Sequence, residues 1–181
     1  MNLLFVRHGQ TDLNAAGRIQ GRNDAPLNDT GIAQARWLVE ALRSEEFSLV
    51  ITSPLQRART TAEIIAQAFS VPLQLDDRLL ERDFGTLQNQ PYQTLPVHPV
   101  TGEPDFFRDA YHEFHAEPIC DMMSRVTEFL EDIARKDHPS ILVVAHGGIG
   151  YLFDRLLARS DHPLVHDNGQ VRHYHLTTKK D

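Results

Sequence analysis

The sequence predicts a three-layer α/β/α sandwich, an α/β fold in which a mostly parallel sheet lies between two layers of helices. Short apolar segments of strand length alternate along the chain with longer segments whose apolar residues recur at helical spacing. Such alternation is typical of parallel sheets that are covered by helices on both faces. The chain of 181 residues is long enough for one well-buried domain. We therefore expect residues 1–181 to form a single domain.

Five segments are expected to form the strands of this sheet. The clearest are two uninterrupted apolar runs, Leu3–Val6 and Ile141–Ala145, which have the length and composition of buried strands. The last of the five is expected at an edge of the sheet. In chain order the predicted strands are Asn2–Val6, Leu49–Thr52, Leu73–Leu75, Ile141–Ala145 and Gln170–Thr177.

Four longer segments are expected to form helices between these strands. The first has an N-cap candidate in Asn28, Asp29 or Thr30, and the second begins at Ser53-Pro54, a favourable pair for a helix start. The third also begins at a proline and carries a single apolar stripe, as expected of a helix that packs on a sheet. In chain order the predicted helices are Thr30–Arg43, Pro54–Phe69, Pro118–Arg135 and Gly148–Leu157.

Residues 86–117, which we call the excursion, interrupt this alternation with four prolines. Within the excursion, Asp105–Glu117 is a candidate short helix with aromatic residues on one side. Long connections in compact domains often serve as lids or binding loops. Two interpretations remain open, a lid with apolar contacts to a substrate or a surface segment whose aromatic side chains simply pack on the domain. The aromatic residues concerned are Phe84, Phe106, Phe107, Tyr111 and Phe114.

Composition excludes several classes of function. The net charge of −7, from 18 basic and 25 acidic residues, argues against a nucleic-acid partner. No apolar run approaches the ~18–20 residues that span a bilayer, and no basic stretch precedes the first apolar run as in a secretory signal. The only cysteine, Cys120, excludes an internal disulfide and fits a reducing compartment. We therefore expect a cytoplasmic protein without membrane or nucleic-acid partners; the sequence does not indicate an oligomeric state.

Two histidines follow the two clearest strands. Arg7-His8-Gly9 ends the first apolar run, and His146-Gly147-Gly148 ends the second. Because ligands bind at the carboxyl ends of strands in open α/β sheets, both imidazoles should meet at one edge. Arg57, near the start of the helix after the second strand, should point to the same edge. The combination predicts an anion site, with phosphate as the leading ligand.

The order of several motifs resembles the histidine phosphatase superfamily, which includes the phosphoglycerate mutases, and in particular its phosphatases with an Arg-His-Gly motif. Five blocks in the family's order cover most of the chain. They are Arg7–Asn14; Gly17–Gly21 with Pro26-Leu27, Gly31 and Gln34-Ala35; Ser53–Ala58 with Thr61-Ala62; Leu80–Gly85; and Val144–Gly148. The resemblance implies a phosphoglycerate mutase-like fold in which the excursion forms a small cap.

The resemblance also implies roles for individual residues. His8 would be the nucleophile that forms a phosphohistidine, with its other ring nitrogen donating to a backbone carbonyl. Arg7, Arg57 and His146 would bind the transferring phosphoryl group, with His146 as a cation. The implied substrate-binding residues are Asn14, Gln20 and Gly21.

Glu81 matches the family's proton donor. One carboxyl with a raised pKa can protonate the leaving alcohol and later deprotonate the attacking water. The alternative is a surface ion pair of Glu81 with Arg78 or Arg82.

No metal or cofactor is expected. The pairs His112-x-x-His115 and His173-x-His175 have tolerable ligand spacing but no evident third and fourth ligands, and surface histidines are the better interpretation. Arg7 and Arg57 would repel a cation from His8 and His146.

The excursion departs from the family pattern, which bears on the reaction. Thr86–Gln90 replaces the Trp-Glu-Gly-like step of many relatives, and Arg108 is the only strong base within residues 86–117. With few cations to retain a doubly charged intermediate, water should compete well. The implied function is a phosphoric monoester hydrolase that acts on a small phosphorylated metabolite. Two alternatives remain, a phosphoglycerate mutase and a phosphate-binding regulatory module with little turnover.

Overall fold

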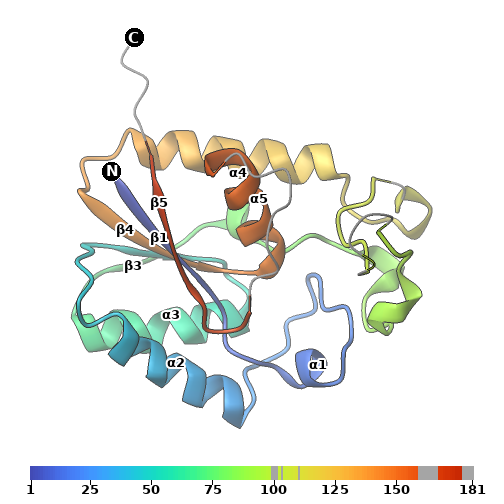
Figure 1. Cartoon of the computed structure of the whole chain (residues 1–181), viewed down its shortest axis with the longest axis horizontal. Coiled ribbons are helices and arrows are strands. Elements are labelled where there is room, and N and C mark those ends of the chain that lie inside the picture. Colours follow the sequence, from blue (N-terminus) through green and yellow to red (C-terminus); the bar gives the residue numbers. More distant parts are fainter. Residues whose placement is uncertain (99–101, 103, 110, 159–166, 177–181) are drawn as a thin grey trace.

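The computed structural model describes residues 1–98, 102, 104–109, 111–158 and 167–176. Its centre is a five-stranded sheet in the order β3-β2-β4-β1-β5 (Figure 1). The first four strands in this order run parallel, and β5 pairs antiparallel with β1 at the edge. The strands are β1 (Asn2–Arg7), β2 (Val50–Thr52), β3 (Leu73–Leu75), β4 (Ser140–Ala145) and β5 (Val171–His175). The predicted mostly parallel sheet with a C-terminal edge strand is therefore confirmed, although Thr177 of the predicted last strand lies outside the described residues.

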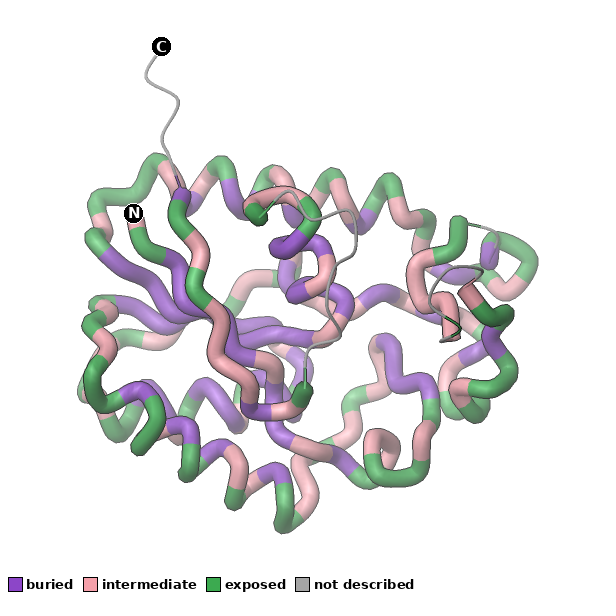
Figure 2. The backbone as a smooth tube through the Cα atoms, viewed as in Figure 1, coloured by how far each residue is buried: buried purple, intermediate pink, exposed green. Residues whose placement is uncertain are grey.

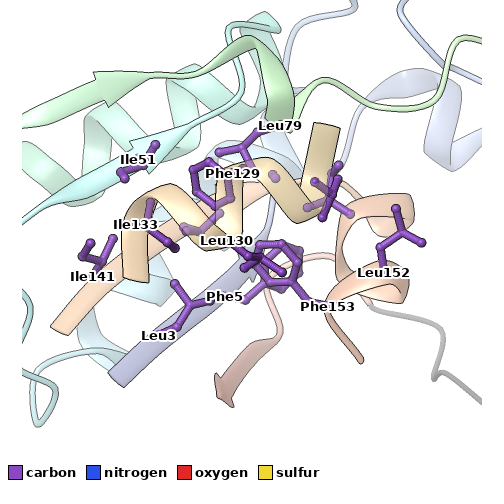
Figure 3. Close-up of a cluster of buried hydrophobic side chains, with 14 of the residues drawn as sticks. Leu3, Phe5, Ile51, Leu79, Phe129, Leu130, Ile133, Ile141, Leu152 and Phe153 are labelled. Atoms are coloured by element: carbon purple, nitrogen blue, oxygen red, sulfur yellow. The ribbon is translucent and has the colours of Figure 1, made fainter. Parts of the chain in front are cut away.

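Helices cover both faces of the sheet, as predicted (Figure 1). The alternation of side chains along β1 sends Leu3 and Phe5 to one face and Leu4 and Val6 to the other. Leu3 and Phe5 pack with residues of α4 and α5, as Figure 3 shows, whereas Leu4 and Val6 pack with α2 and α3. The helices are α2 (Asp29–Ala41), α3 (Gln56–Phe69), α4 (Ile119–Ala134) and α5 (Gly147–Leu157).

The interior of this sandwich is the most buried part of the molecule (Figure 2). Every residue of β4 is buried, because the strand lies between β1 and β2 with helices on both sides. A strand that is buried on both faces is mostly apolar, which is why Ile141–Ala145 forms a continuous hydrophobic run in the sequence. In the part of the chain that the structure describes, no helix is long and apolar enough to cross a membrane.

The loop after β1 packs directly on the start of α2. Asn28 is the N-cap of α2 and accepts a hydrogen bond from the Gly31 amide. A Cβ on Gly9 would lie 2.4 Å from the carbonyl oxygen of Gly31, so neither backbone could approach so closely with a side chain at position 9. The loop continues into the short helix α1 (Asp12–Ala15), whose N-cap is Thr11. This contact fixes the segment that carries His8.

The excursion contributes to a small apolar cluster that also contains Ile19 and Phe84, and the candidate helix at Asp105–Glu117 does not form among its described residues. Among the described residues of that segment, only the 3-10 turn His112–Phe114 forms, and His115 ends it with a φ of 57°. Phe84 and Tyr111 are buried in the cluster, and Phe106 and Phe114 pack against it. Phe107 instead stacks on Tyr151 of α5. The aromatic side chains thus pack on the protein itself. This favours the interpretation of a surface segment and removes the indication of an apolar substrate.

Candidate active site

The two histidines meet at the carboxyl ends of adjacent strands. Val6 of β1 lies in register with Val144 of β4, so His8 and His146 follow neighbouring strand ends. Their ring centroids are 5.2 Å apart, and both side chains are buried. The predicted convergence of the two motifs at one edge of the sheet is therefore present in the structure.

A hydrogen bond at each ring nitrogen orients His8. Its Nδ1 lies 2.6 Å from the carbonyl oxygen of Gly9, so Nδ1 carries the proton and donates it, as expected from the sequence. Its Nε2 accepts a hydrogen bond of 3.2 Å from Nε of Arg57. The lone pair of Nε2 therefore faces the guanidinium that would bind an anion, which is the orientation that a nucleophile needs.

Arg57 is held rigidly in the first turn of α3. Its Nη1 donates to the carbonyl oxygen of Asn23 and its Nη2 to that of Gly21, each at 2.8 Å. Gly21 adopts a left-handed φ of 53°, and a Cβ there would lie 2.3 Å from the side-chain oxygen of Gln88. Gly21 thus acts through its backbone, by accepting from Arg57, and the tight turn explains why a glycine stands there.

Burial and positive charge determine the protonation of the site. Burial lowers the pKa of Arg57 to about 10 and lowers the pKa of Arg7, yet both remain cations at neutral pH. Burial first and the charge of Arg57 second lower the pKa of His8 and of His146 well below the usual 6.5. Both imidazoles are therefore neutral at pH 7. For His146 this direction runs against the expected cation, because burial beside two arginines disfavours the protonated ring.

His146 is the N-cap residue of α5, and its ring has an unusual environment. Among the described residues, neither of its two buried ring nitrogens has a hydrogen-bond partner. Buried polar atoms are nearly always paired, and exceptions often belong to functional sites. An anion placed between His8 and His146 would accept the N–H of this ring.

The side chain of Glu81 lies at the start of α5, the helix that His146 caps. Its Oε2 accepts from the Gly148 amide at 3.1 Å, and its Oε1 accepts from the Arg82 amide at 2.9 Å. The proposed ion pair with Arg78 or Arg82 does not form. Arg78 pairs instead with Asp76 and Asp132, and the Arg82 guanidinium donates to backbone carbonyls. Glu81 is half-buried, and its carboxyl group lies beside the first turn of α5.

Thr11 orients two of the predicted substrate-binding residues. Its hydroxyl lies 3.1 Å from Oδ1 of Asn14 and 2.8 Å from Oε1 of Gln20. Because both amide oxygens face Thr11, the amide NH2 groups are the ends that can donate to a ligand. Sequence reasoning missed Thr11. The Thr-x-x-Asn spacing of a capping box, which the structure contains, could have revealed it.

The candidate metal pairs lie apart from this site. His112 and His115 are exposed in the excursion, while His173 pairs with Glu45 and His175 contacts Asn2. Within the described ranges, no group of three or more His, Cys, Asp or Glu side chains could hold a metal ion. These histidines are surface residues.

Comparison with known families agrees with this geometry. The model of the histidine phosphatase superfamily (branch 1) matches residues 3–178, which is nearly the whole chain. A probable phosphoglycerate mutase, GpmB, from Proteus mirabilis is 33% identical over 166 residues, which are 87% of this chain and 75% of that protein. The match to the GpmB of Yersinia pestis is 41% identical but shorter, and covers 52% of this chain and 44% of that one.

Solved structures show the same fold. TTHB049 from Thermus thermophilus superposes with a TM-score of 0.73 at 30% identity, covering 96% of this chain and 92% of that chain. A candidate alpha-ribazole-5'-P phosphatase from Escherichia coli K-12 superposes with a TM-score of 0.70 at 28% identity, covering 87% and 79%. The family match and the convergence of His8, Arg57, Glu81 and His146 therefore indicate the same site.

Proposed function

Because the chain belongs to the histidine phosphatase superfamily, we propose that it hydrolyses small phosphomonoesters through a phosphohistidine at His8, without a metal ion. The observation that supports this proposal most strongly is the environment of the His8 ring. Nδ1 is fixed by Gly9, and Nε2 faces the guanidinium of Arg57. A neutral imidazole held in this way is a competent nucleophile at pH 7.

The first half of the reaction transfers the phosphoryl group to the enzyme. Nε2 of His8 attacks phosphorus, the bond from phosphorus to the leaving oxygen breaks, and Glu81 donates a proton to that oxygen. Arg7, Arg57 and an N–H of His146 bind the equatorial oxygens, where negative charge must be neutralised. Asn14 and Gln20 contribute their amide NH2 groups.

The second half returns the enzyme to its starting state. Glu81, now a carboxylate, takes a proton from water while the water oxygen attacks phosphorus and the bond to Nε2 breaks. Inorganic phosphate leaves, and His8 is again neutral with its proton on Nδ1. The hydrogen bond from Nδ1 to Gly9 stabilises the positive ring of the intermediate throughout.

A mutase is the second candidate, since the Proteus relative is named a probable phosphoglycerate mutase. A mutase must retain a bisphosphorylated intermediate, whose charge calls for several cations around the site. Arg108 of the excursion is exposed, and Arg82 and Arg125 are engaged by the protein's own carbonyls and carboxylates. The exposure of Arg108 and the hydrogen bonds of Arg82 and Arg125 support hydrolysis over phosphoryl retention, and the substrate we propose is a small cytoplasmic metabolite.

Phosphate release tests the proposal and separates the two candidates. We expect chelator-resistant release from an aryl phosphate that disappears in His8→Ala. Loss of activity on adding chelator would contradict the metal-free mechanism. Isomerisation of a phosphoglycerate primed by a bisphosphoglycerate, at a rate far above its hydrolysis, would establish the mutase instead.

A further inference from the structure

Among the proposed catalytic residues, Glu81 is the one that lies in a loop and not on, or directly after, a helix or strand. His8 and His146 directly follow strands, and Arg57 lies on a helix. Glu81 follows the 3-10 turn Asp77–Leu79 in a loop segment. Catalytic groups must be held within about 0.5 Å of their working positions, so this loop needs fastening from elsewhere in the protein.

Arg125 of α4 supplies this support from behind the loop. Its Nη1 donates to the carbonyl oxygens of Arg78 and Leu80, each at 2.6 Å. Its Nη2 makes a longer contact of 3.4 Å with the carbonyl oxygen of Glu81 itself. One planar guanidinium thus contacts three carbonyls of the segment that ends at the proton donor.

Glu117, at the end of the excursion, holds Arg125 in place. Its carboxylate accepts from Nε and Nη2 of Arg125 at 2.7 and 2.8 Å, in a two-pronged ion pair whose side chains are 11% and 15% exposed. It also accepts from the Asp83 amide at 3.3 Å, and its own amide donates to the Asp83 carbonyl at 2.8 Å. Arg22 adds a second ion pair at 3.3 Å and reaches the Glu81 carbonyl at 3.4 Å.

We propose that Glu117 and Arg125 are positioning residues for Glu81, because their ion pair clamps residues 78–83 and so sets where the Glu81 carboxylate lies. The inference rests on the proposed function. Neither residue need touch the substrate, since each acts through the backbone on either side of Glu81. The clamp holds this backbone from α4, and the Gly148 amide fixes the carboxylate from α5.

The dependence of rate on the leaving group separates positioning of Glu81 from general damage. An alkoxide leaving group needs a proton from Glu81, whereas a p-nitrophenolate leaves without one. We would therefore measure kcat/KM for ethyl phosphate and for p-nitrophenyl phosphate in wild type, Glu81→Gln, Glu117→Gln and Arg125→Lys. This parameter reports the steps up to formation of the phosphohistidine.

The expected result is a selective loss on the alkyl substrate. Glu117→Gln should lower kcat/KM for ethyl phosphate by about tenfold or more, and for p-nitrophenyl phosphate by less than about threefold, because misplacing an acid forfeits part of its contribution. Arg125→Lys keeps the positive charge but loses the planar guanidinium that contacts the three carbonyls. It should show the same selective loss on ethyl phosphate. Glu81→Gln should show it more strongly.

Glu131→Gln is the matched control. It removes an exposed carboxylate from the same helix as Arg125, α4, outside the clamped residues 78–83. It should leave the ratio of the two substrates unchanged. Thermal unfolding of each variant, together with its activity on p-nitrophenyl phosphate, shows that the protein is folded.

The outcomes distinguish this inference from the function on which it rests. An active wild type with equal losses on both substrates, or with no loss, in Glu117→Gln and Arg125→Lys would overturn the positioning role alone. If Glu117→Gln does not fold, the ratio measured in Arg125→Lys decides. A folded wild type that hydrolyses neither substrate would overturn the proposed function as well.

Discussion

The amide of Gly148 donates a hydrogen bond of 3.1 Å to the carboxylate of Glu81. A Cβ at position 148 would lie 2.2 Å from the other Glu81 oxygen, so a side chain there would push the Glu81 carboxyl group away. The last glycine of the His146-Gly147-Gly148 motif therefore has a specific role, since it lets the proton donor approach the first turn of α5. The two residues are far apart in sequence, and neither motif alone indicates that they touch.

Gly148→Ala should consequently displace Glu81. We expect kcat/KM for an alkyl phosphate to fall by about 100-fold, since a misplacement of about 1 Å can cost that much. Gly147→Ala is the matched control on the same helix, where the new Cβ would meet the Arg7 guanidinium at an ordinary 3.6 Å. Equal losses in the two variants, measured by steady-state kinetics, would argue against a specific contact with Glu81.

Replacing Arg57 should weaken both the nucleophile's orientation and phosphoryl binding. Arg57→Lys loses the Nε contact to His8 and the forked contacts to Gly21 and Asn23. We expect kcat/KM to fall by about 10²–10³, the usual cost of removing one preorganised donor. Arg59→Lys, an exposed change on the same helix beside Glu63, should have little effect. A similar loss at both positions would contradict the role of Arg57.

The two buried histidines should make stability depend on pH. Their pKa values in the folded protein are well below 6.5, so the unfolded chain binds more protons as the pH falls below 6.5. The free energy of unfolding should therefore decrease as the pH drops from 7 towards 5, with each histidine contributing up to about 1.4 kcal/mol per pH unit. His146→Gln should reduce this slope in urea titrations. An identical slope in wild type and His146→Gln would show that His146 is not buried in its neutral form.

The hydroxyl of Thr11 should matter for both stability and substrate binding. Thr11→Val removes the N-cap of α1 and the contacts to Asn14 and Gln20. The cap alone should cost about 1 kcal/mol in the free energy of unfolding. We further expect a higher KM, because the two amide groups lose the partner that orients them. A stability loss with KM unchanged would mean that these amides do not contact the substrate.

Local patterns were sufficient for the sheet and for the pair of histidines. The apolar runs before His8 and His146 are uninterrupted because helices cover both faces of β1 and β4. The burial of these two strands therefore made them recognisable in the sequence. Strand ends then placed the two imidazoles at one edge. The sequence offers three candidates for the N-cap of α2, and only the hydrogen bond from the Gly31 amide identifies Asn28 as the cap.

Contacts over long sequence distances explain what the patterns missed. The helix expected at Asp105–Glu117 fails because the buried Arg82 guanidinium takes the carbonyls of Phe106 and Arg108, which a helix would use for its own ladder. In the same way, no spacing rule connects Glu117 and Arg125 with Glu81. The neutral state of His146 also depends on burial beside two arginines, which the sequence does not specify.

The most direct test of the central claim is to trap the phosphorylated enzyme. Wild type would be mixed with a labelled phosphomonoester, quenched within milliseconds in base and mapped by peptide sequencing. We predict a base-stable, acid-labile phosphate on the peptide that contains His8, and no label in His8→Asn. Turnover in the wild type with no phosphate on His8 at any time point would contradict the mechanism.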